Sequence, residues 1–232
     1  MDIIHLTYPE QPQKDPAVVA LGFFDGVHLG HQQVIAAARK EAEARRLPLA
    51  VMTFDPHPKQ VLGKGDEPVR YITPLERKLE KIEQLGADRV YVIEFTIPFS
   101  ELSPQAFVDE YLIASGAEHV VAGFDYSYGR FGAGKMATLD FHSRGTFTHT
   151  VVAEFQEEAE KISSTRIRRL LAAGEVEQAA HLLGEPYQIK GTIIHGDARG
   201  RQIGFPTANM RPEFSYVIPK LGVYATFVRL AD

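Results

Sequence analysis

Five short apolar runs between residues 17 and 153 most strongly constrain what this 232-residue chain can fold into. Amphipathic segments separate the runs: within residues 31–46, for example, Val34, Ile35 and Ala38 share one stripe of a helix and charged residues share the other. This alternation is typical of βαβ units around a parallel sheet. The expected strands are residues 17–24, 49–54, 89–95, 119–123 and 146–152.

Capping signals predict where several helices begin and end. Residues 73–76 have the pattern of a capping box with proline at the first helical position, and Ser103 before Pro104 predicts a helix that ends near Gly116. Residues 164–173 and 176–183 are predicted to form two short helices, each followed by a glycine suited to the C′ position.

The pattern becomes β-type after Tyr187. Residues 189–195 and 222–230 are expected strands on either side of a glycine-rich stretch, and no helical periodicity returns. The expected organisation is therefore an α/β domain over residues 1–184 followed by an all-β segment over residues 185–232. The second piece is small for an independent fold.

Composition excludes several classes of function. The chain has no cysteine, which rules out a disulfide framework, a thiolate metal site and a cysteine nucleophile. A net charge of -5 argues against a general nucleic-acid binder. The longest apolar run, residues 17–24, is far shorter than the roughly 20 residues that span a bilayer. We therefore expect a soluble, cytoplasmic protein that binds neither nucleic acid nor membranes, and the sequence leaves homo-oligomer formation open.

Residues 22–31 lie where the first expected strand meets the first helix, and they contain three glycines, Asp25, His28 and His31. Helix N-terminal amides favour an anion, glycines let the backbone approach it, and imidazoles can donate hydrogen bonds to phosphoryl oxygens. The segment therefore predicts a phosphate site. The alternative is a pair of capping or surface histidines at a βα turn.

Residues 162–168 open a later helix with three hydroxyl side chains, and Arg166 and Arg168 follow them. Hydroxyls, backbone amides and guanidinium groups suit a polyphosphate that gains charge during a transfer reaction. The alternative is an ordinary serine N-cap on a basic helix.

Two further segments follow the carboxyl ends of expected strands, where ligands bind in open parallel sheets. Residues 53–58 offer the ring of Phe54 and the imidazole of His57, and residues 123–129 offer aromatic rings and a carboxylate. These faces and polar groups suit a flavin ring, although any one of the aromatic residues is as readily explained as core. The glycine-rich residues 129–136 are expected to form a mobile loop over that site.

Together the histidine loop and the Ile-Ser-Ser-Thr segment resemble the nucleotidyltransferase superfamily. With residues 53–58, 121–129 and 200–209, the chain resembles the bacterial riboflavin kinase/FMN adenylyltransferase (FAD synthetase) family. The resemblance implies a Rossmann-like nucleotidyltransferase domain with a parallel sheet, followed by an incomplete riboflavin kinase barrel. It also implies that the chain converts FMN and ATP to FAD and pyrophosphate with Mg²⁺.

The resemblance further assigns roles to individual residues. The catalytic residues are His28, His31, Ser164 and Arg168. The further ATP-binding residues are Gly22, Phe23, Asp25, Gly26, Gly30, Ser163 and Thr165. The flavin-binding residues are Phe54, His57, Phe124, Asp125, Tyr126 and Tyr128. In the kinase segment, Thr207 and Asn209 are implied to reach Mg²⁺ and the ATP phosphates.

The kinase part is shorter here than the family pattern. The segment that carries the kinase's catalytic base and much of its riboflavin site is missing, so we expect this chain to have lost phosphorylation of riboflavin to FMN. Two other functions remain open: an adenylyltransferase for a pantetheine or nicotinamide nucleotide, and a non-catalytic flavin or nucleotide sensor.

Overall fold

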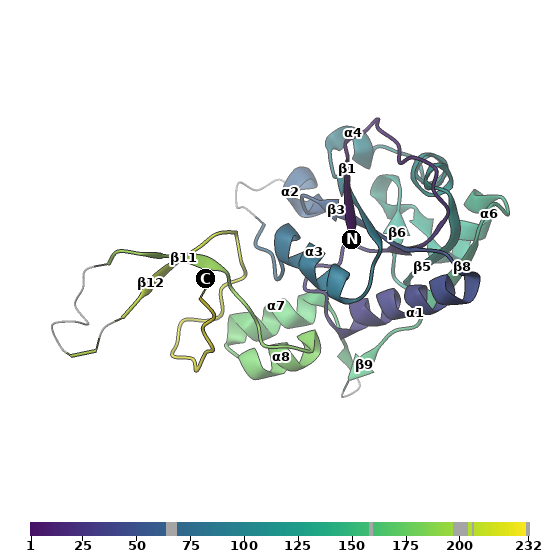
Figure 1. Ribbon diagram of the computed structural model, residues 1–232. Helices are drawn as coiled ribbons and strands as arrows, with labels where there is room; N and C mark the ends of the chain where they lie inside the picture. The colour runs from purple at the N-terminus through teal and green to yellow at the C-terminus, as the bar shows by residue number, and fades with distance from the viewer. Residues whose placement is uncertain (64–68, 158–159, 197–203, 206, 231–232) are drawn as a thin grey trace.

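The computed structural model describes residues 1–63, 69–157, 160–196, 204–205 and 207–230 (Figure 1). Its centre is a six-stranded sheet in the order β1-β4-β3-β2-β5-β8, and every neighbouring pair is parallel. The strands are β1 (Asp2–Leu6), β2 (Ala17–Leu21), β3 (Leu49–Asp55), β4 (Arg89–Glu94), β5 (Ala117–Gly123) and β8 (Thr148–Val152). The strand order reverses between β2 and β5, the point at which Rossmann-like sheets bind ligands. The predicted α/β class with a parallel sheet is confirmed.

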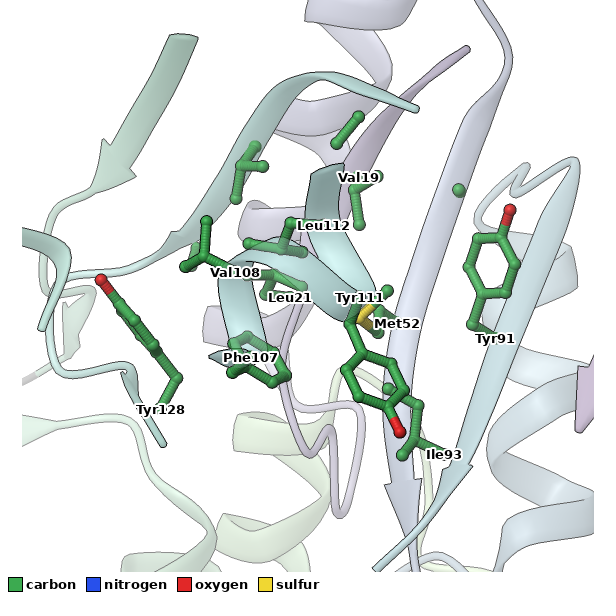
Figure 2. Packing of buried hydrophobic residues seen from close by; sticks show 14 of the residues in the cluster. Val19, Leu21, Met52, Tyr91, Ile93, Phe107, Val108, Tyr111, Leu112 and Tyr128 are labelled. Atoms are coloured by element: carbon green, nitrogen blue, oxygen red, sulfur yellow. The ribbon is translucent and has the colours of Figure 1, made fainter. Parts of the chain in front are cut away.

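Helices cover both faces of this sheet, and β2 shows why. Val18 and Ala20 pack in one cluster with α1 (Leu29–Arg45) and α3 (Leu75–Gln84), while Val19 and Leu21 point to the opposite face. There they meet α5 (Pro104–Phe107), the π-helical turn η1 (Val108–Ile113) and α6 (Leu139–Ser143), whose packing Figure 2 shows in part. A strand buried on both faces needs apolar residues at every position, which explains the continuous run in the sequence.

The remaining elements are short and surround the carboxyl ends of the strands or follow the sheet. They are α2 (Pro58–Leu62), α4 (Ile97–Ser100), β6 (Ser127–Tyr128), η2 (Arg130–Gly132), β7 (Gly134–Lys135), η3 (Met136–Thr138), β9 (Gln156–Glu157), β10 (Glu160–Lys161), α7 (Ser164–Ala173), α8 (Val176–Leu183), β11 (Gly191–Ile194) and β12 (Asn209–Pro212). Helices α7 and α8 form a third apolar cluster together with Ile72.

Most predicted boundaries agree with the structure, but one predicted cap is wrong and one strand was missed. All five expected strands are present, Ser103 caps α5, and α7 and α8 end at left-handed glycines. The predicted capping box at residues 73–76 is wrong, because α3 begins after Pro74 without any side-chain cap. Strand β1 was not predicted, since it is an edge strand on which only Leu6 is buried.

The C-terminal segment differs from the expectation at one place. Strands β11 and β12 form an antiparallel pair that Figure 1 shows extending away from the main sheet. The strand predicted at residues 222–230 is wrong: residues 223–230 form no strand, and Val223 and Phe227 are fully exposed because no neighbouring strand pairs with them. Of the predicted 200–209 motif, Gly204, Phe205 and residues 207–209 are described, and the rest lies outside the described residues. Among described helices, none has the length and apolar character needed to cross a membrane.

Candidate active site

A cavity of about 750 Å³ opens at the carboxyl ends of the parallel strands. Its wall includes Leu21 at the end of β2, Phe54 of β3, Gly123 of β5 and Val152 of β8. The cavity therefore lies across the β2–β5 switch point, where the strand order makes adjacent loops diverge.

His28 and His31 stand together at the N-terminus of α1 and line the cavity. Nδ1 of His28 accepts a hydrogen bond from the backbone N–H of His31 at 3.3 Å, and the two rings stack with centroids 3.6 Å apart. Since Nδ1 is an acceptor, the proton of a neutral His28 resides on Nε2, which can donate to a ligand. His28 therefore caps α1, the alternative considered from the sequence, and its Nε2–H still faces the cavity as a donor.

Both imidazoles are held in the neutral form. Burial, followed by the charge of Lys161, lowers the pKa of His28 to about 4. Burial and then the neighbouring His28 lower the pKa of His31 well below its usual value. The buried Nδ1 of His31 has no hydrogen-bond partner among the described residues. The pair therefore presents neutral hydrogen-bonding groups to the cavity.

The loop that carries these histidines has an unusual backbone. Phe24 and Val27 have φ angles of 57° and 45°, and Gly26 has a φ of 95°. Left-handed conformations of bulky residues are costly and persist where the surroundings enforce them. Asp25 provides part of that enforcement, because its Oδ1 accepts hydrogen bonds from the N–H groups of Ile72 and Thr73 at 3.0 and 3.1 Å.

The N-terminus of α7 faces the same cavity. Oγ of Ser163 accepts from the backbone N–H of Arg166 at 3.2 Å, and Oγ of Ser164 donates to the carbonyl of Asp25 at 2.8 Å. Ser163, Ser164 and Thr165 line the cavity. Ser164 thus links the start of α7 to the histidine loop, so two helix N-termini present their dipoles to one space.

Four residues predicted to belong to the site, as catalytic, ATP-binding or flavin-binding residues, do not line the cavity. Asp25, Gly26, His57 and Arg168 are not among the residues that line the cavity. Asp25 is buried and forms an ion pair with Arg168 at 2.5 Å. Arg168 also donates to the carbonyl of Arg70 at 2.6 Å, so its guanidinium ties α7 to the back of the loop.

The other half of the cavity is aromatic. The predicted flavin-binding residues Phe54, Phe124, Tyr126 and Tyr128 line it, and so does Asp125. Phe54 is only 8% exposed and packs against Phe99 and Phe107, so it belongs to the core as well as to the wall. His57 packs edge-on against Phe23 with ring centroids 4.4 Å apart, one layer behind the cavity.

A charged side chain and an apolar patch complete this wall. Lys161 reaches across the cavity from β10, where its Nζ pairs with Asp125 at 2.5 Å and lies 4.6 Å from the ring centroid of Phe124. Sequence reasoning missed an apolar patch formed by α2, α4 and residues that flank α4, because its members are scattered through short segments without periodicity. The patch consists of Pro58, Leu62, Phe95, Phe99 and Leu102. Gly129 and Phe131 of the glycine-rich loop do border the cavity.

The implied metal residues are far less enclosed. Thr207 and Asn209 are exposed and are not among the cavity-lining residues. Within the described part of the chain, no group of three or more histidine, aspartate or glutamate side chains is arranged to hold a metal ion.

The fold and the site together define a nucleotidyltransferase of the Rossmann-like class, and comparison with known proteins gives the family. Residues 10–166 match the family model of FAD synthetase, and residues 183–232 match that of riboflavin kinase. The chain belongs to the FAD synthetase family: it is an FMN adenylyltransferase family enzyme that carries a partial riboflavin kinase region.

Individual relatives support the same family assignment. The chain is 59% identical over 213 residues to the bifunctional riboflavin kinase/FMN adenylyltransferase of Listeria monocytogenes, covering 92% of this chain and 68% of that protein. It is 51% identical over 228 residues to the enzyme of the same name from Bacillus subtilis, covering 97% and 72%. A crystal structure described as a macrolide-efflux protein from Streptococcus pneumoniae superposes with a TM-score of 0.84 at 35% identity, covering 95% of this chain and 73% of that one.

Proposed function

We propose that this chain transfers the adenylyl group of ATP to FMN in the cavity at the β2–β5 switch point. One observation carries the proposal: His28 and His31 at the start of α1 and Ser163 to Thr165 at the start of α7 line the same cavity, which continues into an aromatic half. The polar half suits a triphosphate, and the aromatic half suits an isoalloxazine ring. In this proposal residues 1–184 form the adenylyltransferase domain and residues 185–232 belong to the kinase domain.

The reaction needs positioning more than it needs an activated nucleophile. An oxygen of the FMN phosphate attacks the α-phosphorus of ATP, the bond from that phosphorus to the α,β-bridging oxygen breaks, and pyrophosphate leaves with the bonding electrons. The attacking phosphate is already anionic near neutral pH, so the residues must align the reactants and stabilise charge on the leaving group.

The described residues supply suitable donors for that charge. Neutral His28 donates from Nε2, and the free N–H groups at the starts of α1 and α7 point their dipoles at the same anion. Ser163 and Thr165 complete the phosphate-binding wall, together with Gly22, Phe23 and Gly30 of the facing loop. Arg168 acts from behind by holding Asp25 and the loop in place.

Mg²⁺ fits this site as a companion of ATP. The phosphate-facing wall offers imidazoles and hydroxyls rather than a carboxylate cage, so the ion would be held mainly by the nucleotide's own phosphate oxygens, where it would offset their charge. At the kinase segment, Thr207 and Asn209 carry the hard oxygen donors that the same ion prefers.

The direct test is product analysis. Incubation with ATP, Mg²⁺ and FMN should yield FAD and pyrophosphate, resolved by chromatography. Nicotinamide mononucleotide and phosphopantetheine, supplied in parallel, should give no adenylylated product. Transfer to either of them in preference to FMN would overturn the substrate assignment, and FMN binding without turnover would indicate a sensor.

We further propose that this 232-residue chain does not phosphorylate riboflavin. Its described residues beyond Gly184 contain a single two-stranded sheet, Thr207 and Asn209 are exposed beside and on that sheet, and none of these described residues forms a pocket that would position a ribityl hydroxyl for in-line attack. With riboflavin, ATP and Mg²⁺ we expect no FMN. Appreciable FMN formation would show that this segment is a working kinase site.

A further inference from the structure

A buried lysine lies beneath the histidine loop, and the chemistry described above does not use it. Lys78 of α3 is 2% exposed. Its Nζ donates to the carbonyl of Phe23 at 3.1 Å, to Oγ1 of Thr53 at 3.1 Å and to the carbonyl of Phe54 at 3.3 Å. It also lies 4.6 Å from the centre of the Phe23 ring, within the range of a cation–π contact. One ammonium group thus joins the ends of β2 and β3.

Burying this ammonium group costs desolvation free energy, which a purely structural side chain at the same position would not require. All three acceptors are neutral, and among the described residues no carboxylate comes within 4.0 Å of the ammonium. Burial accordingly lowers the pKa of Lys78 to about 8, although Asp55 and Asp25 act in the opposite direction from farther away. A buried cation without an adjacent carboxylate carries a desolvation cost, whereas a leucine or methionine at this position of α3 would carry none.

The carbonyl that Lys78 holds belongs to the strained part of the loop. The Phe23 carbonyl accepts from Lys78 and also from Oγ1 of Thr53 at 3.0 Å, and the next residue, Phe24, has a φ of 57°. In a trans peptide the C=O and N–H point in opposite directions, so the Phe24 N–H is turned away from Lys78. Phe23 and Phe24 both line the cavity.

A second lysine of α3 acts on the same loop. Lys81 lies one helical turn after Lys78, and its Nζ donates to the carbonyl of Gly26 at 3.3 Å while pairing with Glu185 at 2.7 Å. Residues three apart on a helix share a face, so α3 holds the carbonyls on both sides of Phe24 and Asp25.

We propose that Lys78 is a positioning residue for adenylyl transfer: it fixes the Phe23–Phe24 peptide so that the histidine loop faces the triphosphate, and it places a positive charge directly behind that loop. Lys81 is the weaker second clamp. This inference rests on the proposed use of the cavity for ATP.

The experiment compares three ligands that share an adenosine but differ in charge: adenosine, AMP and ATP. In Lys78→Met we expect affinity for ATP to fall by at least about 10-fold, for AMP by less and for adenosine by less than about 2-fold, because a charge behind the loop acts on phosphates. FAD formation should show a lower kcat as well as a raised KM for ATP. Lys40→Met, on the exposed face of α1, is the matched control and should behave as wild type.

Thr53→Val provides a second variant that keeps shape and strand propensity. It removes the hydroxyl that links Lys78 to the Phe23 carbonyl, so a smaller loss with the same dependence on phosphate number is expected. If Lys78→Met fails to fold, the ligand series on Thr53→Val decides the question.

Equal losses for adenosine, AMP and ATP, or unchanged ATP affinity and kcat in a folded Lys78→Met protein, would overturn the proposal. Failure of the underlying function would be seen separately, as absence of FAD formation by the wild-type chain.

Discussion

The main sheet and the C-terminal segment have similar apolar sequence patterns, but the residues are buried in the first and exposed in the second. Every residue of β2 is buried, and β3 is buried up to its last residue, because helices pack on both faces. In β11 and β12 nearly every residue is exposed, and residues 223–230 form no strand although Val223, Phe227 and Val228 are apolar. An apolar pattern becomes a strand only where neighbours supply hydrogen bonds and a covering surface. We therefore expect the first region, the main sheet with its loops, to carry out adenylyl transfer, and the second region, the C-terminal segment, to contribute little to it.

The largest effect is expected at the histidines of the first region. His28→Ala and His31→Ala should each lower FAD formation by on the order of 100-fold or more, since each removes a group that we propose to stabilise charge on the leaving pyrophosphate. Initial rates with FMN and ATP measure the effect, and circular dichroism checks that the sheet survives. Near wild-type rates in both variants would remove these residues from the mechanism.

A smaller loss, on the order of 10-fold in turnover, is expected for Arg168→Ala. This change leaves the buried carboxylate of Asp25 with its two backbone N–H donors but without its cation, so the loop behind the phosphates loosens. FMN affinity should change little.

The neighbouring Arg169 supplies the control. Its side chain is 66% exposed and pairs with Glu160 at the surface, so Arg169→Ala should leave turnover unchanged. A collapse of FMN affinity in Arg168→Ala with ATP affinity retained would show that this segment serves the flavin rather than the triphosphate.

The sequence predicts the features that depend on neighbouring residues and misses those that depend on contacts between distant segments. The four largely buried strands, β2 to β5, and the two helix N-termini were predictable because continuous apolar runs, glycines and serine caps are local patterns. The edge strand β8 was also predicted, although none of its residues is buried. Strand β1 was not, because an edge strand with one buried side chain leaves no such run. Lys78 was hidden for a different reason: its three partners come from segments 24 to 55 residues away, and a lysine on an amphipathic helix looks like part of the solvated face.

The pH dependence of stability should also separate the regions. The pKa of His28 is about 4 in the folded protein against 6.5 as the ordinary value, so the unfolded chain binds more protons between these values and stability falls as pH is lowered through that window. From pH 7.5 to 5.5 this residue alone should reduce the free energy of unfolding by about 1 kcal/mol. Urea denaturation of wild type and His28→Gln measures it. An identical pH dependence in both proteins would contradict a neutral, buried His28.

The smallest effect is expected in the second region. Asn209→Ala and Thr207→Ala should change FAD formation by less than about 2-fold, because both side chains are exposed on or beside β12 and neither lines the cavity. The two regions do touch elsewhere: Tyr71, whose hydroxyl accepts from the N–H of His57, forms a parallel bridge with the buried Tyr216. That bridge involves residues 215–217, beyond β12, so loss of either polar side chain leaves it intact. A drop of 10-fold or more in FAD formation in either variant, with unchanged thermal stability, would mean that the kinase segment contributes directly to the adenylyl site and that the chemistry cannot be assigned to the first region alone.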